Sequence, residues 1–360
     1  MRLLTRAPHT PLPPLTGSPY ERYAPHALAA VVAVVALLMP QVLADHHVSV
    51  FVLMVLAAIV VTGLSMLMGY AGQVSLGQAS FYLIGGYTAG LTATHGWPTW
   101  LGLAAAPLVA AFSAALVGIP LLRLRGHHLA FATLAVQLIL LNIVGQLDWT
   151  GGDIGLQAIP RFQIFGYEFA DEQSYAYLAL AALAVVVLVA RNIVASRPGR
   201  ALRALATSEV AAESAGVPVA GYKLAVFSLS AAFAGLAGGI YAYYIGYVSP
   251  GSFPVLLSFE YVVMAVVGGL GTIWGALVGA TAITLLLQAL NDLGTREGMP
   301  ASAPAVLSHA VYGAVLVLVV LYLPRGIVPA LTGARHRIAT LRRKRDISRS
   351  AGAAGTTGAV

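Results

Sequence analysis

Charged residues are scarce in this chain of 360 residues: 9% are Asp, Glu, Lys or Arg, whereas 59% are hydrophobic. A soluble domain is typically about 25% charged, so this chain has too few charges to cover a surface that faces water. Most of its surface must therefore face lipid. The chain also has no cysteine, which excludes disulfides, thiolate chemistry and cysteine-based metal sites.

Lysine is rare as well, because Lys223 and Lys344 are the two in the whole chain. Neither follows the glycine pattern of a Walker A loop, so the chain cannot cradle ATP in that way. The adjacent pairs His46-His47 and His127-His128 are interpreted as interfacial or loop residues, since helix neighbours do not share a face. We therefore expect no metal site, no cofactor bound by this chain itself and no enzymatic activity.

Long apolar runs dominate what is present. A spanning helix needs about 20 mostly apolar residues. The candidate spans are 27–44, 48–68, 79–95, 100–122, 129–147, 175–190, 223–247, 256–270, 275–290 and 305–323. The eighth and ninth are short and share the junction Gly268-Gly269-Leu270-Gly271, so they are either two spans or one re-entrant element followed by a helix. The sequence predicts an all-α integral membrane protein with about ten transmembrane helices.

The few charges separate strongly between alternate loops. The ten spans place 18 of the 20 Lys and Arg residues on one side and leave Arg161 and Arg296 on the other. Nine of the 13 acidic residues lie on the other side if Glu260 is counted at the outer end of its helix. Glu260 is interpreted as a residue at the external interface, and the alternative is that it has a gating role or binds the amine of the solute. Because positive charge marks the cytoplasmic side, both termini are predicted to be cytoplasmic, in a bacterial cell (inner) membrane. Topology thus accounts for the net charge of +7, and no nucleic-acid partner is expected.

Composition divides the chain into three regions. Residues 1–26 are Pro-rich and are expected to form a disordered cytoplasmic tail. Residues 27–325 form a polytopic membrane domain, and 326–360 form a basic, low-complexity cytoplasmic tail. The first span resembles a signal peptide, but the 26 residues before it make a long n-region, which favours an uncleaved anchor.

A faint internal similarity relates two segments of the membrane domain. Gly69-Tyr70 followed by Ser80-Phe81 is similar to Gly246-Tyr247 followed by Ser258-Phe259. The first copy opens from a cytoplasmic loop and the second from an external loop, as an inverted repeat would. The match needs small gaps, so a chance similarity is the alternative.

The largest polar segment inside the membrane domain is 196–222, which is basic and helix-prone. Pro198 suits the first turn of a helix. Thr207-Ser208 can cap a second helix, in whose first turn Glu209 is favourable. Gly216, with Pro218 two residues on, is a stop signal. The segment is therefore predicted to form two short helices joined by a turn, on the cytoplasmic side.

The second of these helices has two distinct faces. Glu209 and Glu213 lie four residues apart and project from one face. Ala211, Ala212 and Ala215 form a small-residue face that permits close approach of another protein. An ordinary solvated loop is the alternative interpretation of the whole segment.

Sequence motifs add a resemblance to a known family. Glu209-Val-Ala211-Ala212-x-x-x-Gly216 resembles the EAA loop of ABC importer permeases, which docks into a cleft of the ATPase subunit. Longer blocks at 69–90, 199–243 and 249–280 resemble the branched-chain amino-acid permeases of the LivM/LivH type. The hydrophobic-x-Leu-Pro continuation of other importers is missing, which points to the LivM/LivH branch. Together the blocks cover about residues 50–325.

The resemblance implies a membrane-spanning permease subunit of an ABC importer for branched-chain amino acids or related small polar solutes such as amides and urea. It also implies a second, LivH-like permease, two ATP-binding subunits that bind the ATP, and an extracytoplasmic solute-binding protein. The implied coupling-loop residues are Arg200, Arg203, Glu209 and Glu213 for polar contacts, and Ala211, Ala212 and Gly216 for fit. A stand-alone secondary transporter or channel is the alternative, and the sequence does not name the solute.

Two further groups of residues are candidate functional or packing sites. Gly72, Gln73, Ser75, Gly77 and Gln78 combine amides and a hydroxyl with helix-breaking glycines at a membrane boundary, which suits either a translocation pathway or a tight turn that packs helices. The second group is interpreted as a helix-packing surface, because small residues let helices approach closely. It comprises Gly268, Gly269, Gly271, Gly275 and Gly279.

Overall fold

The computed structural model describes residues 33–42, 45–124 and 126–294, with residues 310, 311, 313, 314, 317 and 326–328. The described residues fall into two separate units, divided after residue 43. The described part of the first unit is an apolar helix, Ala33–Val42. The expected tail 1–26, most of the tail 326–360 and most of the expected span 305–323 lie outside the described residues.

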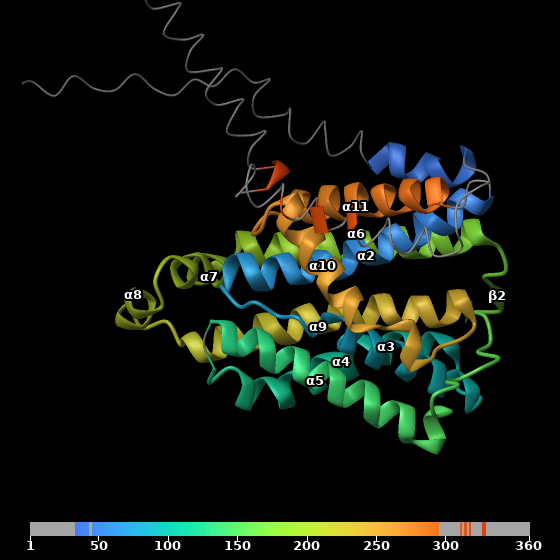
Figure 1. Ribbon diagram of the computed structural model, residues 1–360, viewed down its shortest axis with the longest axis horizontal. Coiled ribbons are helices and arrows are strands. Elements are labelled where there is room, and N and C mark those ends of the chain that lie inside the picture. The colour runs from blue at the N-terminus through green and yellow to red at the C-terminus, as the bar shows by residue number, and fades with distance from the viewer. Residues whose placement is uncertain are drawn as a thin grey trace, which may run out of the picture. The chain divides into compact units, whose positions relative to one another are not determined.

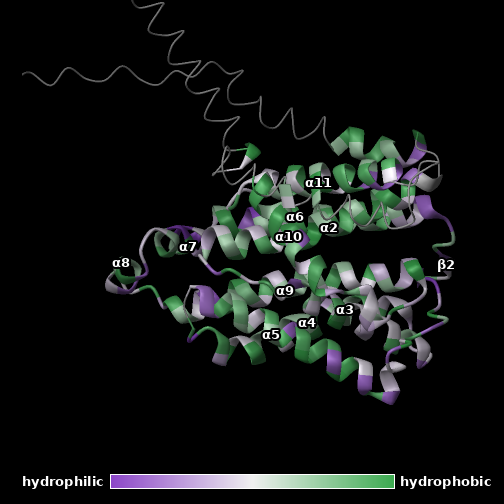
Figure 2. Cartoon of the chain, in the orientation of Figure 1, coloured by the Kyte–Doolittle hydropathy of each residue, from purple (hydrophilic) through white to green (hydrophobic). Residues whose placement is uncertain are grey.

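Among the described residues, seven helices are long and apolar enough to cross a membrane (Figure 1). They are α2 (Asp45–Tyr70), α4 (Thr99–Leu121), α5 (His127–Gln146), α6 (Glu172–Ala195), α9 (Val219–Ile245), α10 (Val255–Gly268) with the preceding 3-10 turn η2 (Pro250–Ser252), and α11 (Ile273–Gly294). A further apolar helix, α3 (Gln78–Thr94), has 17 residues. Figure 2 shows that these helices are mostly hydrophobic. The prediction of an all-α membrane protein is confirmed.

Helix α9 is central to the packing, because it contacts α2, α3 and α4 along its length. Small residues allow the backbones to approach closely. A Cβ atom at Gly85 would collide with the backbone of Gly235, and one at Gly238 would collide with the carbonyl oxygen of Tyr82. A Cβ at Gly235 would also lie 2.7 Å from the carbonyl oxygen of Ala106. Glycine is therefore what lets α3 and α4 pack against α9.

Two of the membrane crossings are interrupted. Residues 71–77 separate α2 from α3 without helical structure, and residues 246–254 separate α9 from α10 in a similar way, apart from η2. The two shorter helices begin side by side, because the amide of Ala79 donates a hydrogen bond to Ser258 Oγ at 2.9 Å. With 14 residues, α10 is about 21 Å long, less than the roughly 30 Å of a bilayer core. With the preceding turn η2, however, the candidate span is Pro250–Gly268, 19 residues, so this crossing consists of a non-helical part followed by the short helix α10.

The same order of elements thus occurs twice: long helix, break, shorter helix and long helix. The end of α2 meets the start of the second copy's last helix, where Gly69 touches Gly271. The chain after α9 meets the middle of α3, where Val248 lies 3.7 Å from a Cβ built on Gly86. Each copy thus packs against the other, and the inverted repeat stays a prediction.

The position of Glu260 differs from the expectation. The sequence placed this residue at the outer end of its helix. In the structure, α10 begins next to the first turn of α3, and Glu260 is the sixth of its 14 residues. Glu260 is half-buried and therefore lies farther along α10 than a residue at the helix end would.

Two of the described connections lie at opposite ends of the helices (Figure 1). The connection between α5 and α6 contains the 3-10 turn η1 (Asp148–Thr150) and the strands β1 (Gln163–Ile164) and β2 (Tyr167–Glu168). It pairs with the chain after α9, because Leu156 and Val248 exchange backbone hydrogen bonds of 2.8 and 3.0 Å. At the opposite end lie α7 (Arg197–Thr207) and α8 (Glu209–Ser214) (Figure 1).

Candidate functional site

The interruption between α2 and α3, residues 71–78, is here called the polar break. Inside a membrane protein, non-helical backbone is tolerated only where its polar groups are satisfied by protein or by a water-filled cavity. Side chains from other helices bond to this segment and to the residue that follows it. The amide of Leu76 donates to Thr133 Oγ1 at 2.9 Å, and the amide of Ala79, just after the break, donates to Ser258 Oγ. The break is therefore held by α5 and α10 as well as by its own chain.

The side chain of Gln78 extends this network to α9. Its Nε2 atom donates to the carbonyl oxygen and to Oγ of Ser230, at 3.0 and 2.9 Å. Ser258 Oγ in turn donates to Gln137 Oε1 at 2.7 Å. A layer of polar side chains from α3, α5, α9 and α10 thus meets at the start of α3, where the surrounding sequence is apolar.

The structure brings together four of the five residues predicted for a pathway. Gln73, Ser75, Gly77 and Gln78 are all buried, and the exposed fraction of Gln78 is 1%. Gly72 is exposed and has a φ of +63°, a conformation that favours glycine. The Oε1 atoms of Gln73 and Gln78 are buried and accept no hydrogen bond from the described part of the chain. In this conformation solvent does not reach either oxygen atom.

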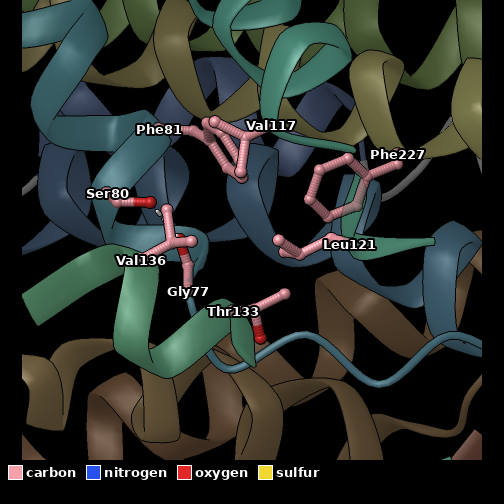
Figure 3. A pocket seen from close by; sticks show the side chains of 8 residues that line it. All are labelled: Gly77, Ser80, Phe81, Val117, Leu121, Thr133, Val136 and Phe227. Atoms are coloured by element: carbon pink, nitrogen blue, oxygen red, sulfur yellow. Dashed lines mark hydrogen bonds between the residues drawn. The ribbon is translucent and has the colours of Figure 1, made fainter. Parts of the chain in front are cut away.

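A narrow recess adjoins the polar break (Figure 3). It is lined by Gly77, Ser80, Phe81, Val117, Leu121, Thr133, Val136 and Phe227. The recess contains about 170 Å³ of empty space, spread too thinly to admit a water molecule. Ser80 and Thr133 supply its polar side chains, and the other lining groups are apolar or glycine. In this conformation the recess is closed to a solute of amino-acid size.

Sequence reasoning missed the residues on the other helices that complete the polar layer. They are Thr133, Gln137, Ser230 and Ser258. A usable signal was present, because each is a polar residue inside an apolar candidate span. Thr133 and Gln137 also lie four apart, so they share one face of α5. The sequence does not show that the polar faces of α5, α9 and α10 meet next to residues 71–78.

The second candidate region is the exposed segment that contains α7 and α8. The prediction of two short helices is confirmed. Ser208 caps α8, since its Oγ accepts a hydrogen bond from the amide of Ala211 at 3.3 Å. Gly216 follows the helix with a φ of +79°, as its role as a stop signal requires. Figure 2 shows hydrophilic residues gathered at α7 and α8.

The predicted coupling-loop residues separate into surface and interior groups. Ala211, Glu213 and Gly216 on and after α8 are exposed, as are Arg200 and Arg203 on α7. Ala212 faces inward, with an exposed fraction of 1%. Glu209 forms an ion pair with Lys223 at 2.6 Å, and Arg203 donates to the carbonyl oxygen of Val194 at 3.0 Å. Ala212 and Glu209 are therefore occupied by contacts within the chain.

An apolar side chain that the sequence did not single out lies on the surface of α8. Val210 is 74% exposed, beside exposed Ala211 and Glu213. An open hollow next to the helix is lined by Glu213 and residues 216–221. The accessible surface of α8 thus combines the apolar side chain of Val210 with a small residue and a charged residue, and it borders this hollow.

The predicted glycine surface lies where α10 meets α11. A Cβ atom at Gly268 would collide with the carbonyl oxygen of Gly275, and one at Gly279 would collide with that of Met264. Gly271, at a φ of +72°, lies against Gly69, and Gly269 lies against Gly326. These glycines permit direct backbone contact between α10, α11 and the end of α2.

Comparison with known proteins identifies similar sequences over most of the chain. Residues 47–320 match a family described as the permease component of branched-chain amino acid transport systems. The high-affinity branched-chain amino acid transport system permease protein LivM of Salmonella typhimurium is 31% identical over 324 residues, which cover 82% of this chain and 73% of that protein. LivM of Escherichia coli is also 31% identical, over 88% of this chain and 77% of its own length. A probable LivM of Methanocaldococcus jannaschii is 23% identical over 59% of this chain and 62% of its own. No solved structure matches.

Proposed function

Because the chain belongs to the family of branched-chain amino acid transport permeases, we propose that its two polar regions divide the work of import. The chain is a membrane-spanning permease subunit of an ABC importer. The polar break belongs to the solute pathway, and the segment around α7 and α8 receives an ATP-binding subunit. The solutes are branched-chain amino acids, as the names of the relatives indicate, or related small polar molecules such as amides and urea.

The observation that carries the pathway assignment is the layer of neutral polar groups at the start of α3. Glutamine and serine can hydrogen-bond a zwitterionic solute without a fixed charge that would trap it. A buried acceptor without a hydrogen bond costs roughly 1–3 kcal/mol, so the Oε1 atoms of Gln73 and Gln78 favour a state in which a polar partner reaches them. A layer that served packing alone would gain by satisfying both oxygens within the chain.

The recess beside the break is closed, so transport requires helices to move. In an importer, ATP binding and hydrolysis on partner subunits shift the population between states that open to either side. The exposed surface of α8, with Val210, Ala211, Glu213 and Gly216, is where we place the ATP-binding subunit. We also propose a LivH-like second permease in the membrane and a solute-binding protein at the opposite end of the helices.

The proposed location is the bacterial inner membrane, with both termini and α8 on the cytoplasmic side. The loop from α5 to α6 then faces outward. A reporter fused after Gln157 should report an external position, and one fused after Val210 an internal position. The reverse pattern would contradict both the topology and the docking of an ATPase at α8.

A stand-alone secondary transporter is the second candidate, and one structural observation favours it. Ion-coupled carriers place ionisable residues deep in the membrane, and Glu260 lies in the middle of α10 rather than at its outer end. Such a carrier would use an ion gradient and would need no ATP-binding partner. The energy source therefore separates the two functions.

The decisive experiment is reconstitution with and without the ATP-binding subunits. We expect uptake of labelled leucine into proteoliposomes to require the partner permease, the ATP-binding subunits, the binding protein and ATP. Uptake by the permease alone, driven by a proton or sodium gradient and abolished by Glu260→Gln, would contradict the importer and support the carrier.

A further inference from the structure

We propose that Glu209 is a positioning residue which fixes α8 to α9 through Lys223, and that one face of α9 transmits displacement of α8 to the start of α3. This inference rests on the proposed function, because it assigns a mechanical role to the segment that receives the ATP-binding subunit. It differs from the expectation that Glu209 itself contacts that subunit. The ion pair joins Lys223 Nζ to Glu209 Oε1 at 2.6 Å, and the lysine side chain is only 12% exposed.

The ion pair is placed to tie α8 to the core. Lys223 lies in the second turn of α9, and Glu209 is the first residue of α8. The lysine is screened from solvent more than its partner, whose side chain is 39% exposed. Partly buried pairs are less weakened by salt than exposed ones. Together with the burial of Ala212, this pair holds α8 in a fixed orientation on α9.

The same face of α9 leads from the ion pair to the polar break. Lys223, Phe227 and Ser230 have the spacing i, i+4, i+7, which places them on one side of a helix. The ring of Phe227 packs edge-on against Phe81, with centroids 5.5 Å apart. Ser230 accepts the hydrogen bonds from Gln78. Figure 3 shows the rings of Phe81 and Phe227 beside the recess.

This face of α9 therefore meets one face of the first turn of α3. Gln78 and Phe81 lie three residues apart, so they share a side of α3. Gln78 contacts Ser230 and Phe81 contacts Phe227. Both residues of α9 lie two helical turns or less from the ion pair. A shift of α9 along its axis would act on the polar break and on the recess at the same time.

Close packing prevents α9 from absorbing the shift internally. A Cβ atom on Gly63 of α2 would lie 3.0 Å from the Cα atom of Ser230. Farther along, Gly238 lies against the carbonyl of Tyr82. Interiors packed at this density transmit strain instead of deforming continuously. Helix α9 thus behaves as a stiff element between the ATPase-facing surface and the solute pathway.

The test uses the complete transporter in proteoliposomes, and it measures the ratio of leucine taken up to ATP hydrolysed. The variants are Glu209→Gln, Lys223→Met and the exchange of both charges, Glu209→Lys with Lys223→Glu. We expect each single variant to lower the ratio at least about fivefold, the lower end of typical coupling between sites. The ATP-binding subunits should still co-purify in normal amounts, and the charge exchange should recover most of the ratio.

Several results would overturn the inference. An unchanged ratio in both single variants would show that the ion pair transmits nothing. Loss of co-purification would make Glu209 a contact residue for the ATPase. If a single variant does not fold, Lys223→Arg keeps the charge and should keep the ratio, so a fivefold loss there in a folded transporter would also contradict the proposal. Failure of the proposed function appears separately, as absence of ATP-driven uptake by the unsubstituted transporter.

Discussion

The polar break and the α7–α8 segment are both polar stretches in an apolar chain, but their surroundings are opposite. Five of residues 71–78 are buried, and α3, α5 and α9 all contribute to their hydrogen bonds. The α7–α8 segment is largely exposed, and most of its side-chain hydrogen bonds are local. The Ala211 amide donates to Ser208 Oγ, for example, and Ser214 Oγ donates to the carbonyl oxygen of Val210.

This difference shows how the same residue types acquire different roles. A serine whose hydroxyl is surrounded by protein becomes part of the fold, because its loss leaves another polar group unsatisfied. An exposed serine has water as an alternative partner, so its contribution to stability is small. Substitutions in the polar break should therefore reduce stability and transport together, whereas those on the surface of α8 should reduce only the binding of a partner.

The largest effect on stability is expected from Gly77→Val. A Cβ at Gly77 would collide with the backbone carbonyl of Thr133. Overpacking typically costs roughly 1–3 kcal/mol and occasionally more, and a backbone atom is less able to move aside than a side chain. We expect little folded protein in a detergent-stability assay. The matched control is Gly221→Val, because a Cβ at Gly221 meets nothing within 4 Å. Equal melting temperatures for the two variants would remove the distinction between the regions.

A smaller effect is expected from Ser258→Ala. This change removes the acceptor for the Ala79 amide and the donor to Gln137, and each buried group left unsatisfied costs roughly 1–3 kcal/mol. The melting temperature should fall clearly. Ser214→Ala serves as the comparison in the exposed segment, since Ser214 bonds only within α8, and its melting temperature should stay at the parental value. A fall of the same size in Ser214→Ala would contradict the account.

Gly72→Ala and Gly216→Ala sharpen the comparison because they should behave alike. Both glycines have positive φ, +63° and +79°, and neither would bring a Cβ within 4 Å of another group. The cost is then the backbone strain of a left-handed alanine, about 1 kcal/mol in each case. Thermal unfolding measures it. A much larger loss at Gly72 would mean that the whole break, and not its packed positions, controls stability.

The smallest effect on stability is expected from Val210→Ser. An exposed side chain away from special contacts changes stability by about 0.5 kcal/mol or less, so the melting temperature should hardly move. Co-purification of the ATP-binding subunits should nevertheless drop at least about fivefold, as for an interface residue worth roughly 1 kcal/mol. Trp149→Ser, an exposed apolar residue at the other end of the helices, is the control and should leave co-purification intact.

Much of the fold could be predicted from the sequence, because apolar length and periodicity directly report helices. The start and end of α8 followed from Ser208 and Gly216, whose capping roles are local. The depth of Glu260 did not, since it depends on α10 starting beside α3. The partners of Gln78 and Glu209 could not be predicted either, because Ser230 and Lys223 are brought next to them by tertiary packing.

The natural absence of cysteine permits one direct measurement of the central claim. Val210→Cys and Ser75→Cys would each carry the sole thiol, to be labelled by a membrane-impermeant maleimide in inside-out vesicles. We predict that Val210→Cys reacts in the permease alone and is protected when the ATP-binding subunits are bound. Ser75→Cys should stay unreactive at rest and become reactive during ATP-driven turnover. Equal labelling of Val210→Cys with and without those subunits, or no labelling of Ser75→Cys during turnover, would contradict the division between a docking surface and a buried pathway.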